Sequence, residues 1–287
     1  MTAERTGDRL FRWAIAGFAG IILLATVALA WQLARESAST WKAFGPSFLR
    51  TSTWDPVADV FGALPFLYGT AVSSLLALLI AVPLGVGAAV FLTELAPKRL
   101  ADVLMFAIEL LAAVPSVILG LMGIFILVPV MRALGSPYGV GMLTAGLILS
   151  FMILPYITTI TREVLLTVPR SLKEAMYALG ATRWEVVRGV SLPFARSGIV
   201  GAVFLSLGRA LGETMAVTMV IGNTPRISAS LLDPGYSMAA VIANELAEAA
   251  SDAHLSALVA IGLTLMAVTI VVNGVARLML YRLGSRR

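Results

Sequence analysis

Apolar residues gather into long runs along this 287-residue chain, and shorter polar segments between them hold most of the charges. A run of about 20 apolar residues has the length that an α-helix needs to cross a bilayer. The pattern therefore predicts an all-α membrane protein with six transmembrane helices. The predicted spans cover residues 13–33, 66–93, 104–131, 141–160, 197–222 and 255–280.

The first apolar run follows a basic segment, residues 1–12, and has Trp13 and Trp31 near its ends. Tryptophan concentrates at membrane–water interfaces, which favours a first span that the protein retains. A basic start, an apolar run and the small residues at 28–30 are also typical of a cleaved signal peptide. We favour the retained span because the run is long enough to cross the membrane.

Two segments between the predicted spans are too polar to cross a membrane. Residues 34–65 contain Trp41 and Trp54, which are typical of a surface or interfacial helix. Residues 238–250 predict a short helix against the outer surface. The second span contains Pro83 with Gly85 and Gly87, and we expect a kink there. The third contains Pro115, an interruption that is tolerated where neighbouring helices satisfy the freed backbone groups.

The composition excludes several classes of protein. The chain is 59% hydrophobic and 13% charged, whereas soluble domains are about 45–50% apolar and roughly 25% charged. It has no cysteine, which excludes disulfides and thiolate metal sites, and a single histidine, His254, argues against a histidine-rich metal site. The net charge of +5 is spread over separate loops, so we expect no nucleic-acid surface.

The distribution of lysine and arginine predicts the orientation of the chain. The N-terminal segment, the turn at 94–103, the loop at 162–196 and the C-terminal end carry 15 of them, against 5 in the other loops. Since cytoplasmic loops carry the excess of positive charge, both termini and the 162–196 loop are predicted to be cytoplasmic. The predicted organisation is a cytoplasmic N-terminus at 1–12, a first span at 13–33, an external segment at 34–65, a five-helix core at 66–281 and a cytoplasmic tail at 282–287.

The loop at 162–196 has the sequence of two short helices joined at a glycine. Ser171 followed by Glu174 has capping-box spacing, and so has Thr182 followed by Glu185. Gly180 stands where a helix C-terminus favours a glycine. The dipeptide Leu192-Pro193 predicts the end of the second helix, because the residue before proline avoids helical angles. The first helix has one apolar face, made by Leu172, Ala175, Met176 and Leu179.

Two charged residues, Arg209 and Glu213, lie inside the predicted fifth span. Arg209 is about 13 residues from the start of that span, roughly 20 Å along a helix and near the bilayer midplane. A charge there costs about 2.5–3.5 kcal/mol on insertion scales, so its presence calls for a reason. The i, i+4 spacing predicts an Arg209–Glu213 ion pair. Gly208 and Gly212, in small-xxx-small spacing, predict close approach of another helix.

Two interpretations of this charged pair stay open. In the first, Arg209 faces a water-filled path and meets an anion, since its planar donor fork suits oxyanions, while Glu213 holds the arginine between anions. In the second, the ion pair locks two helices together. Glu109, the other acid within a predicted span, faces either a subunit contact or the path. The chain has no G-x-x-x-x-G-K-[ST] motif, so we expect any ATP site to lie on another polypeptide.

The loop motifs resemble a known family. Glu174-Ala175, Gly180-Ala181 and Leu192-Pro193 are similar, in residue type and spacing, to the EAA loop of ABC-importer permeases. The segments 54–97, 107–123 and 208–223 resemble the phosphate-uptake permeases of that family, and the form ALGETMAV resembles their PstC-type subunit rather than its PstA-type partner. The resemblance implies the type I ABC-importer (MetI-like) fold, with a loop that docks into a cleft of an ATPase subunit.

The resemblance further implies a heterodimer with a PstA-type permease, two PstB-type ATPase subunits that bind ATP and Mg²⁺, and an external phosphate-binding protein of PstS type. The chain itself would hold no cofactor and no metal and would work in the cell inner membrane. Phosphate would pass Arg209 during alternating access. Two alternatives remain: a permease for sulfate, molybdate or phosphonate, and a membrane protein with no transport role. A homodimer is also open.

Overall fold

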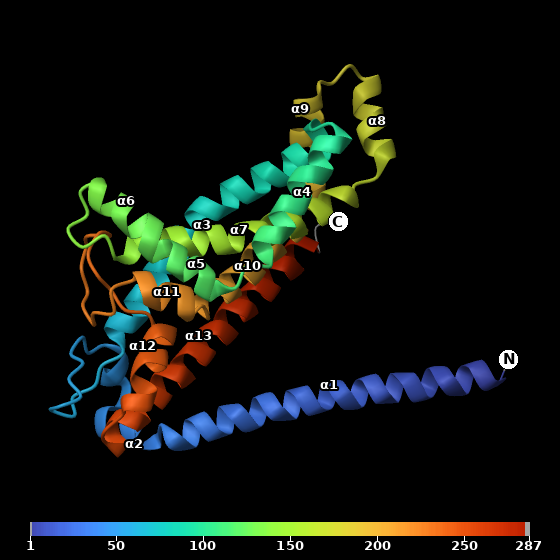
Figure 1. Cartoon of the computed structure of the whole chain (residues 1–287). Helices are drawn as coiled ribbons and strands as arrows, with labels where there is room; N and C mark the ends of the chain where they lie inside the picture. Colours follow the sequence, from blue (N-terminus) through green and yellow to red (C-terminus); the bar gives the residue numbers. More distant parts are fainter. Residues whose placement is uncertain (1, 285–287) are drawn as a thin grey trace.

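The computed structural model describes residues 2–284, and their side chains from 7 to 282 (Figure 1). Within this range the chain is helical, and its strand-like pairing is confined to one bridge between Asp55 and Val60. The predicted all-α class is confirmed. The α-helices are α1 (Thr2–Glu36), α2 (Ala38–Phe44), α3 (Leu64–Val90), α4 (Lys98–Ala112), α5 (Ser116–Met122), α6 (Val128–Ala133), α7 (Met142–Leu166), α8 (Arg170–Ala178), α9 (Arg183–Val186), α10 (Leu192–Leu211), α11 (Met215–Val220), α12 (Met238–Glu245) and α13 (Asp252–Gly284).

Short 3₁₀ and π segments extend several of these helices. The π turns are η2 (Phe91–Leu95), η3 (Gly123–Leu127) and η4 (Val187–Ser191), and the 3₁₀ turns are η1 (Gly45–Leu49) and η5 (Leu246–Glu248). Six stretches of the described residues are long and apolar enough to cross a membrane: Gly7–Glu36, Leu64–Leu95, Ser116–Ala133, Met142–Leu166, Arg183–Leu211 and Asp252–Arg282.

Helices α3 and α7 form the centre of the bundle. Their register is parallel: Gly146, near the start of α7, lies against Leu76, in the middle of α3, and Gly85 lies against Ile157 further along both helices. A side chain at Gly146 would put its Cβ 2.7 Å from the Cβ of Leu76, so glycine is what lets the helices approach here. Around this contact Ala77, Ala81, Ala145, Ile148, Leu149, Ile153 and Ile157 form a buried apolar core that also includes residues of α10 and α11.

Helix α1 lies apart from this bundle. It leaves the other helices near α2 and extends away from them (Figure 1). Its apolar side chains are exposed along its length, as Trp13, at 78% of its surface, and Trp31, at 72%, illustrate. The helix runs through both the predicted span 13–33 and the polar segment before it.

The predicted third span, 104–131, is wrong: the structure divides it into two elements. Helix α4 begins earlier, at Lys98, and ends at Ala112, and α5 begins at Ser116. Val114 precedes Pro115, which has extended angles (φ −59°, ψ 138°) and no N–H to donate, so the helix cannot continue through this point. The membrane-crossing stretch is Ser116–Ala133. Glu109, on the separate helix α4, is exposed in this chain.

The predicted fifth span, 197–222, is also broken. Helix α10 begins already at Leu192 and ends at Leu211, and α11 begins at Met215. The break falls on Gly212, the least favourable helix residue after proline. Glu213 then accepts a hydrogen bond from the N–H of Ala216 (3.2 Å), which satisfies the start of α11 without a continuous helix.

The segment at 34–65 is largely exposed, while its two tryptophans, Trp41 and Trp54, are half-buried; their predicted interfacial position stays a prediction. Trp54 makes edge contacts with Phe61 and Phe66, both at 4.9 Å between ring centroids, and donates from Nε1 to Glu245 (2.9 Å). His254 stacks on Phe61 at 5.5 Å and bonds the same Glu245 oxygen at 3.1 Å. These contacts hold the segment onto the ends of α3, α12 and α13.

The predicted helix at 238–250 is present as α12, with Met238, Ala239, Ala240 and Val241 buried in the bundle. The first half of the helix thus packs on the bundle, at the same end of the molecule as α2 (Figure 1), and its position at the outer membrane surface stays a prediction. The loop before α12 crosses α3 at Tyr236, whose ring lies 5.3 Å from Phe66. Burial raises the pKa of Tyr236 to about 12, and its hydroxyl accepts a hydrogen bond from Asn244 (3.0 Å).

Candidate functional site

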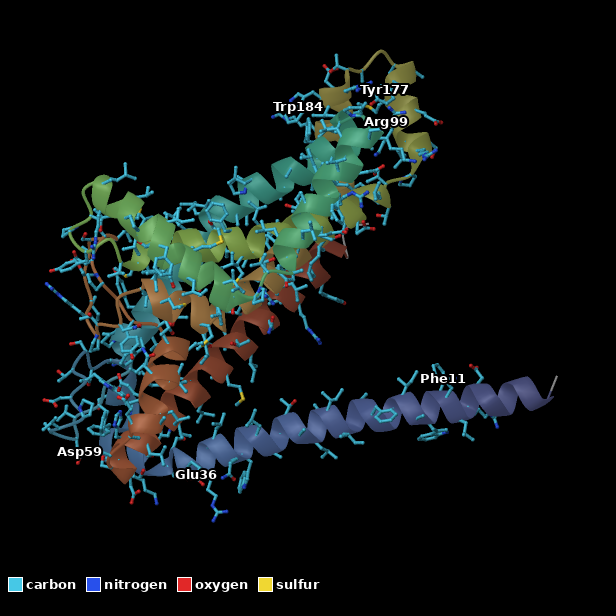
Figure 2. All side chains as sticks on the ribbon, viewed as in Figure 1. Phe11, Glu36, Asp59, Arg99, Tyr177 and Trp184 are labelled. Atoms are coloured by element: carbon cyan, nitrogen blue, oxygen red, sulfur yellow. The ribbon has the colours of Figure 1, made fainter. Side chains whose placement is uncertain are left out.

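The basic loop at 162–196 forms one extremity of the molecule. Helices α8 and α9 lie beyond the ends of α3 and α4, at the end of the bundle opposite α2 and α12 (Figure 1). Tyr177 and Trp184 are at this tip, while Asp59 lies at the other end (Figure 2). The two aromatic side chains are exposed, Tyr177 at 44% and Trp184 at 58%. Aromatic residues this exposed in a small polar tip are typical of a protein contact surface.

The predicted turn between the two loop helices is present. Gly180 has φ +84°, a left-handed conformation that favours glycine. Its N–H bonds to the carbonyl of Tyr177 (2.9 Å), and the Ala181 N–H bonds to that of Met176 (3.1 Å). This pair of bonds is the Schellman motif, which satisfies the carbonyls at a helix C-terminus.

One of the two predicted capping boxes is confirmed. Thr182 accepts a hydrogen bond from the Glu185 N–H, and the Glu185 carboxylate accepts one from the Thr182 N–H. The other is wrong: α8 begins at Arg170 after Pro169, so Ser171 lies inside the helix and makes no cap. Proline at the N-cap fixes the helix start two residues too early for Ser171 to serve.

The prediction that Leu192-Pro193 ends the second helix is wrong. Helix α9 continues through the π turn η4 into α10, and Pro193 lies in the first turn of α10. A proline there removes the N–H that would bond to Gly189, and the wider π turn accommodates that loss without a break. The loop at 162–196 is therefore continuous, through α9 and η4, with the helix that carries Arg209.

An open apolar groove runs between α8 and the start of α10. It has a volume of about 440 Å³ and brings Ala175 together with Pro193, two of the motif residues. Glu174, Ala175, Gly180 and Pro193 are exposed, and Ala181 and Leu192 are half-buried. The rest of the groove is lined by Leu172, Met176, Leu179, Gly189, Val190 and Phe194. The predicted apolar face of the first loop helix is thus one wall of a groove.

The charged pair inside the membrane is arranged differently from the prediction. Within the described part of the chain Arg209 and Glu213 form no ion pair, because the helix ends between them and the i, i+4 geometry is lost. Glu213 instead caps α11. The Arg209 guanidinium lies over the ring of Tyr156, 4.4 Å from its centroid. A cation over an aromatic face is stabilised by about 0.5–2 kcal/mol.

The glycines beside Arg209 face open space. A Cβ on Gly208 would meet nothing within 4 Å, and one on Gly212 would meet only the Gly208 carbonyl oxygen, at 3.8 Å. The predicted close approach of another helix is therefore absent from the described part of this chain. Arg209 itself is exposed. The last turn of α10 is therefore an uncovered surface on which an arginine follows a long apolar helix.

Sequence reasoning missed Tyr156 and Glu94. Tyr156 follows Pro155 in α7, and α7 runs antiparallel to α10, as the contacts of Val164 with Gly198 and of Tyr156 with Arg209 together show. From the Val164–Gly198 contact, eight residues back along α7 and eight forward along α10 bring Tyr156 level with Ser206, about one turn before Arg209. Pairing of the two helices would therefore have brought Tyr156 near the arginine. Glu94, at the end of α3, was assigned to a turn, although its side chain is only 8% exposed.

Residues 81–284 match the family described as "Binding-protein-dependent transport system inner membrane component". With that match over most of its length, and six membrane-spanning stretches, the chain belongs to this family and is a multi-pass membrane protein. Its homologues are permease subunits of ABC transporters.

Two relatives named "Phosphate transport system permease protein PstC" are similar over most of the chain. The protein from Mesorhizobium japonicum is 48% identical over 272 residues, which cover 87% of this chain and 83% of the relative. That from Xylella fastidiosa (strain Temecula1) is 44% identical over 303 residues, which cover 99% and 93%. A solved structure titled as inward-facing MetNI methionine ABC transporter superposes with a TM-score of 0.58 at 21% identity, over 77% of this chain and 94% of that one. The type I importer-permease fold is thereby confirmed.

Proposed function

We propose that this chain is the membrane permease subunit of an ATP-driven importer of inorganic phosphate. The observation that carries the proposal is 48% identity, over 87% of the chain, to a phosphate transport permease. The fold, with six membrane-crossing stretches and a loop tip beyond the bundle, agrees with it.

Arg209 is the residue that we place in the anion path, with Glu213 beside it. An exposed arginine inside an apolar helix, next to two glycines that no side chain covers, suits a surface along which water and an oxyanion pass. Guanidinium offers a planar fork that matches two phosphate oxygens. The Tyr156 ring holds the cation without competing for those donors, and the Glu213 carboxylate keeps its place by capping α11.

A second permease subunit of PstA type would cover this surface and complete the path. In the single chain, no side chain covers Gly208 and Gly212 at the end of α10, and apolar side chains of α4 and α5 are exposed. An external binding protein of PstS type would deliver phosphate at the end of the bundle that holds α2 and α12. Both chain termini and the α8–α9 tip would then be cytoplasmic, in the inner membrane of the cell.

The α8–α9 tip is the part that we expect to bind the ATPase. Two PstB-type subunits would hold ATP and Mg²⁺, because this chain has no phosphate-binding loop of its own. The motif residues Glu174, Ala175, Gly180, Ala181, Leu192 and Pro193 lie on α8, its terminal turn and the start of α10. This chain is then a transport subunit without an enzyme site, and it holds no cofactor itself.

Anion uptake by the full complex tests whether phosphate is the substrate. Vesicles that contain the permease pair, the ATPase and the binding protein are expected to take up labelled phosphate only with ATP inside. A hundredfold excess of sulfate, molybdate or methylphosphonate is expected to leave that uptake unchanged, while unlabelled phosphate removes it. ATP-driven uptake of one of the other anions without phosphate uptake would assign this permease to that oxyanion.

A charged substitution in the apolar groove beside α8 tests whether the ATPase binds there. Ala175→Asp is expected to lower recovery of the ATPase with the purified permease at least about tenfold, because an unpaired carboxylate buried at an interface costs several kcal/mol. Ala178→Asp, on the same exposed helix but outside the groove, is the matched control and should keep the ATPase. Equal recovery with both variants would place the ATPase contact elsewhere on the tip.

A further inference from the structure

A buried carboxylate joins the two halves of the tip to the membrane bundle. Glu94 lies in the π turn η2, which prolongs α3, and its side chain is 8% exposed. Its Oε1 accepts from Lys173 Nζ of α8 (2.6 Å) and from the hydroxyl of Ser191 in η4 (2.8 Å). Lys173 is 19% exposed, and Ser191 is fully buried. One oxygen atom therefore connects α3, α8 and the segment that leads into α10.

Apolar packing alone does not fix α8. Among its residues none is buried, and its apolar face is one wall of the open groove. By contrast, η4 is anchored: Val187 is buried with Ala89 and Val90 of α3, Leu165 of α7 and Ala195 of α10. The Lys173–Glu94 ion pair is therefore a polar tie between a helix with little packing and a bundle that is well packed.

The Lys173–Glu94 ion pair is connected to the proposed anion path through two sets of helices. Ser191 immediately precedes α10, which runs without a break to Arg209 near its other end. On the other side, Glu94 ends the α3 helix that packs along α7, and α7 carries Tyr156 beneath Arg209. Both contact points fall in π turns, which depart from regular helix geometry and recur at functional sites.

We propose that Glu94 is a positioning residue for energy coupling, through which a displacement of α8 by the ATPase moves α3 and α10 together. The inference rests on the proposed function, since it assumes that α8 binds the ATPase. Without the tie, α8 is expected to follow the ATPase while the bundle does not. ATP hydrolysis would then continue with little transport.

The experiment compares anion import with ATP hydrolysis in the same proteoliposomes of the full complex. Glu94→Gln removes the charge and keeps the shape, and it is expected to retain the ATPase and at least half of the hydrolysis rate. The number of phosphate ions imported per ATP hydrolysed is expected to fall at least tenfold. Glu163→Gln is the control, because it removes an ion pair in the same loop, that with Arg162 (2.7 Å), from a side chain that is 61% exposed.

Reversing the charges at both positions distinguishes a specific contact between residues 94 and 173 from a general structural role of Glu94. Glu94→Lys combined with Lys173→Glu restores opposite charges, and the Ser191 hydroxyl can accept from the new lysine, so at least half of the import ratio is expected to return. If Glu94→Gln does not assemble, Lys173→Gln removes the same ion pair from the more exposed side. A wild-type ratio in either assembled variant, or no recovery in the reversed pair, would overturn the proposal.

The two proposals fail in different ways. A wild-type complex that hydrolyses ATP and imports sulfate or molybdate in place of phosphate rejects the substrate, and the ratio for Glu94→Gln is then measured with that anion. A wild-type complex that imports phosphate, with an unchanged ratio in Glu94→Gln, rejects only the role of Glu94.

Discussion

Replacement of Gly69 by alanine is expected to destabilise the native packing of this protein strongly. Gly69 lies in α3 where the loop before α12 crosses it, and a Cβ built there would be 2.1 Å from the carbonyl oxygen of Tyr236. The obstacle is backbone, which cannot rotate away as a side chain would. Overpacking costs about 1–3 kcal/mol and occasionally more, and we expect the upper end of that range.

The loop has little freedom to move away from Gly69. The N–H of Met238 bonds to the hydroxyl of Thr70, the next residue of α3 (2.9 Å), and both groups are buried. The Tyr236 ring packs on Phe66 one turn earlier. A displaced loop would therefore lose a buried hydrogen bond as well as an aromatic contact.

Thermal unfolding of the detergent-purified permease measures this effect. Gly69→Ala is expected to unfold at a clearly lower temperature than the wild type and to give much less folded protein. Gly87→Ala is the matched control on the same helix, because a Cβ there meets nothing within 4 Å. Its better helix propensity should leave stability unchanged or raise it by up to about 1 kcal/mol. Equal stability of the two variants would mean that the loop does not lie against α3.

The number and approximate location of the membrane-crossing stretches follow from apolar run length alone. Run length carries this information because each span needs a minimum of apolar residues wherever it packs. It does not place a helix break. The apolar run continues unchanged in composition through Ala113, Val114 and Pro115. Only the backbone requirement of proline ends α4 there. Run length likewise gives no sign of the break at Gly212, between α10 and α11.

The local chemistry of the tip was predictable where it depends on adjacent residues. The glycine at 180 and the Thr182–Glu185 box each act within one turn, and both are confirmed. Contacts between elements were not predictable. Glu94 meets Lys173 across 79 positions of sequence, and no period or motif relates the two. The Arg209–Glu213 pairing failed for a related reason, since it assumed one helix across a break.

The Arg209→Gln variant is expected to assemble normally and to lose phosphate uptake. Glutamine keeps a polar side chain but has neither the charge nor the two-donor fork that matches an oxyanion. The loss is expected to be about tenfold to a hundredfold, because a hydrogen bond to a charged group contributes about 1.5–3 kcal/mol. Arg209→Lys keeps the charge without the fork and should fall between glutamine and wild type.

Two controls connect this loss to the path rather than to folding or net charge. Arg277→Gln removes an exposed arginine from α13 and should leave uptake unchanged. Tyr156→Phe keeps the aromatic face under the guanidinium and should retain uptake, whereas Tyr156→Leu frees the arginine and is expected to change the KM for phosphate more than the maximal rate. Uptake is measured in vesicles with matched amounts of complex and ATPase. Normal uptake by an assembled Arg209→Gln complex would make the arginine structural, and the anion route would then have to avoid this face of α10.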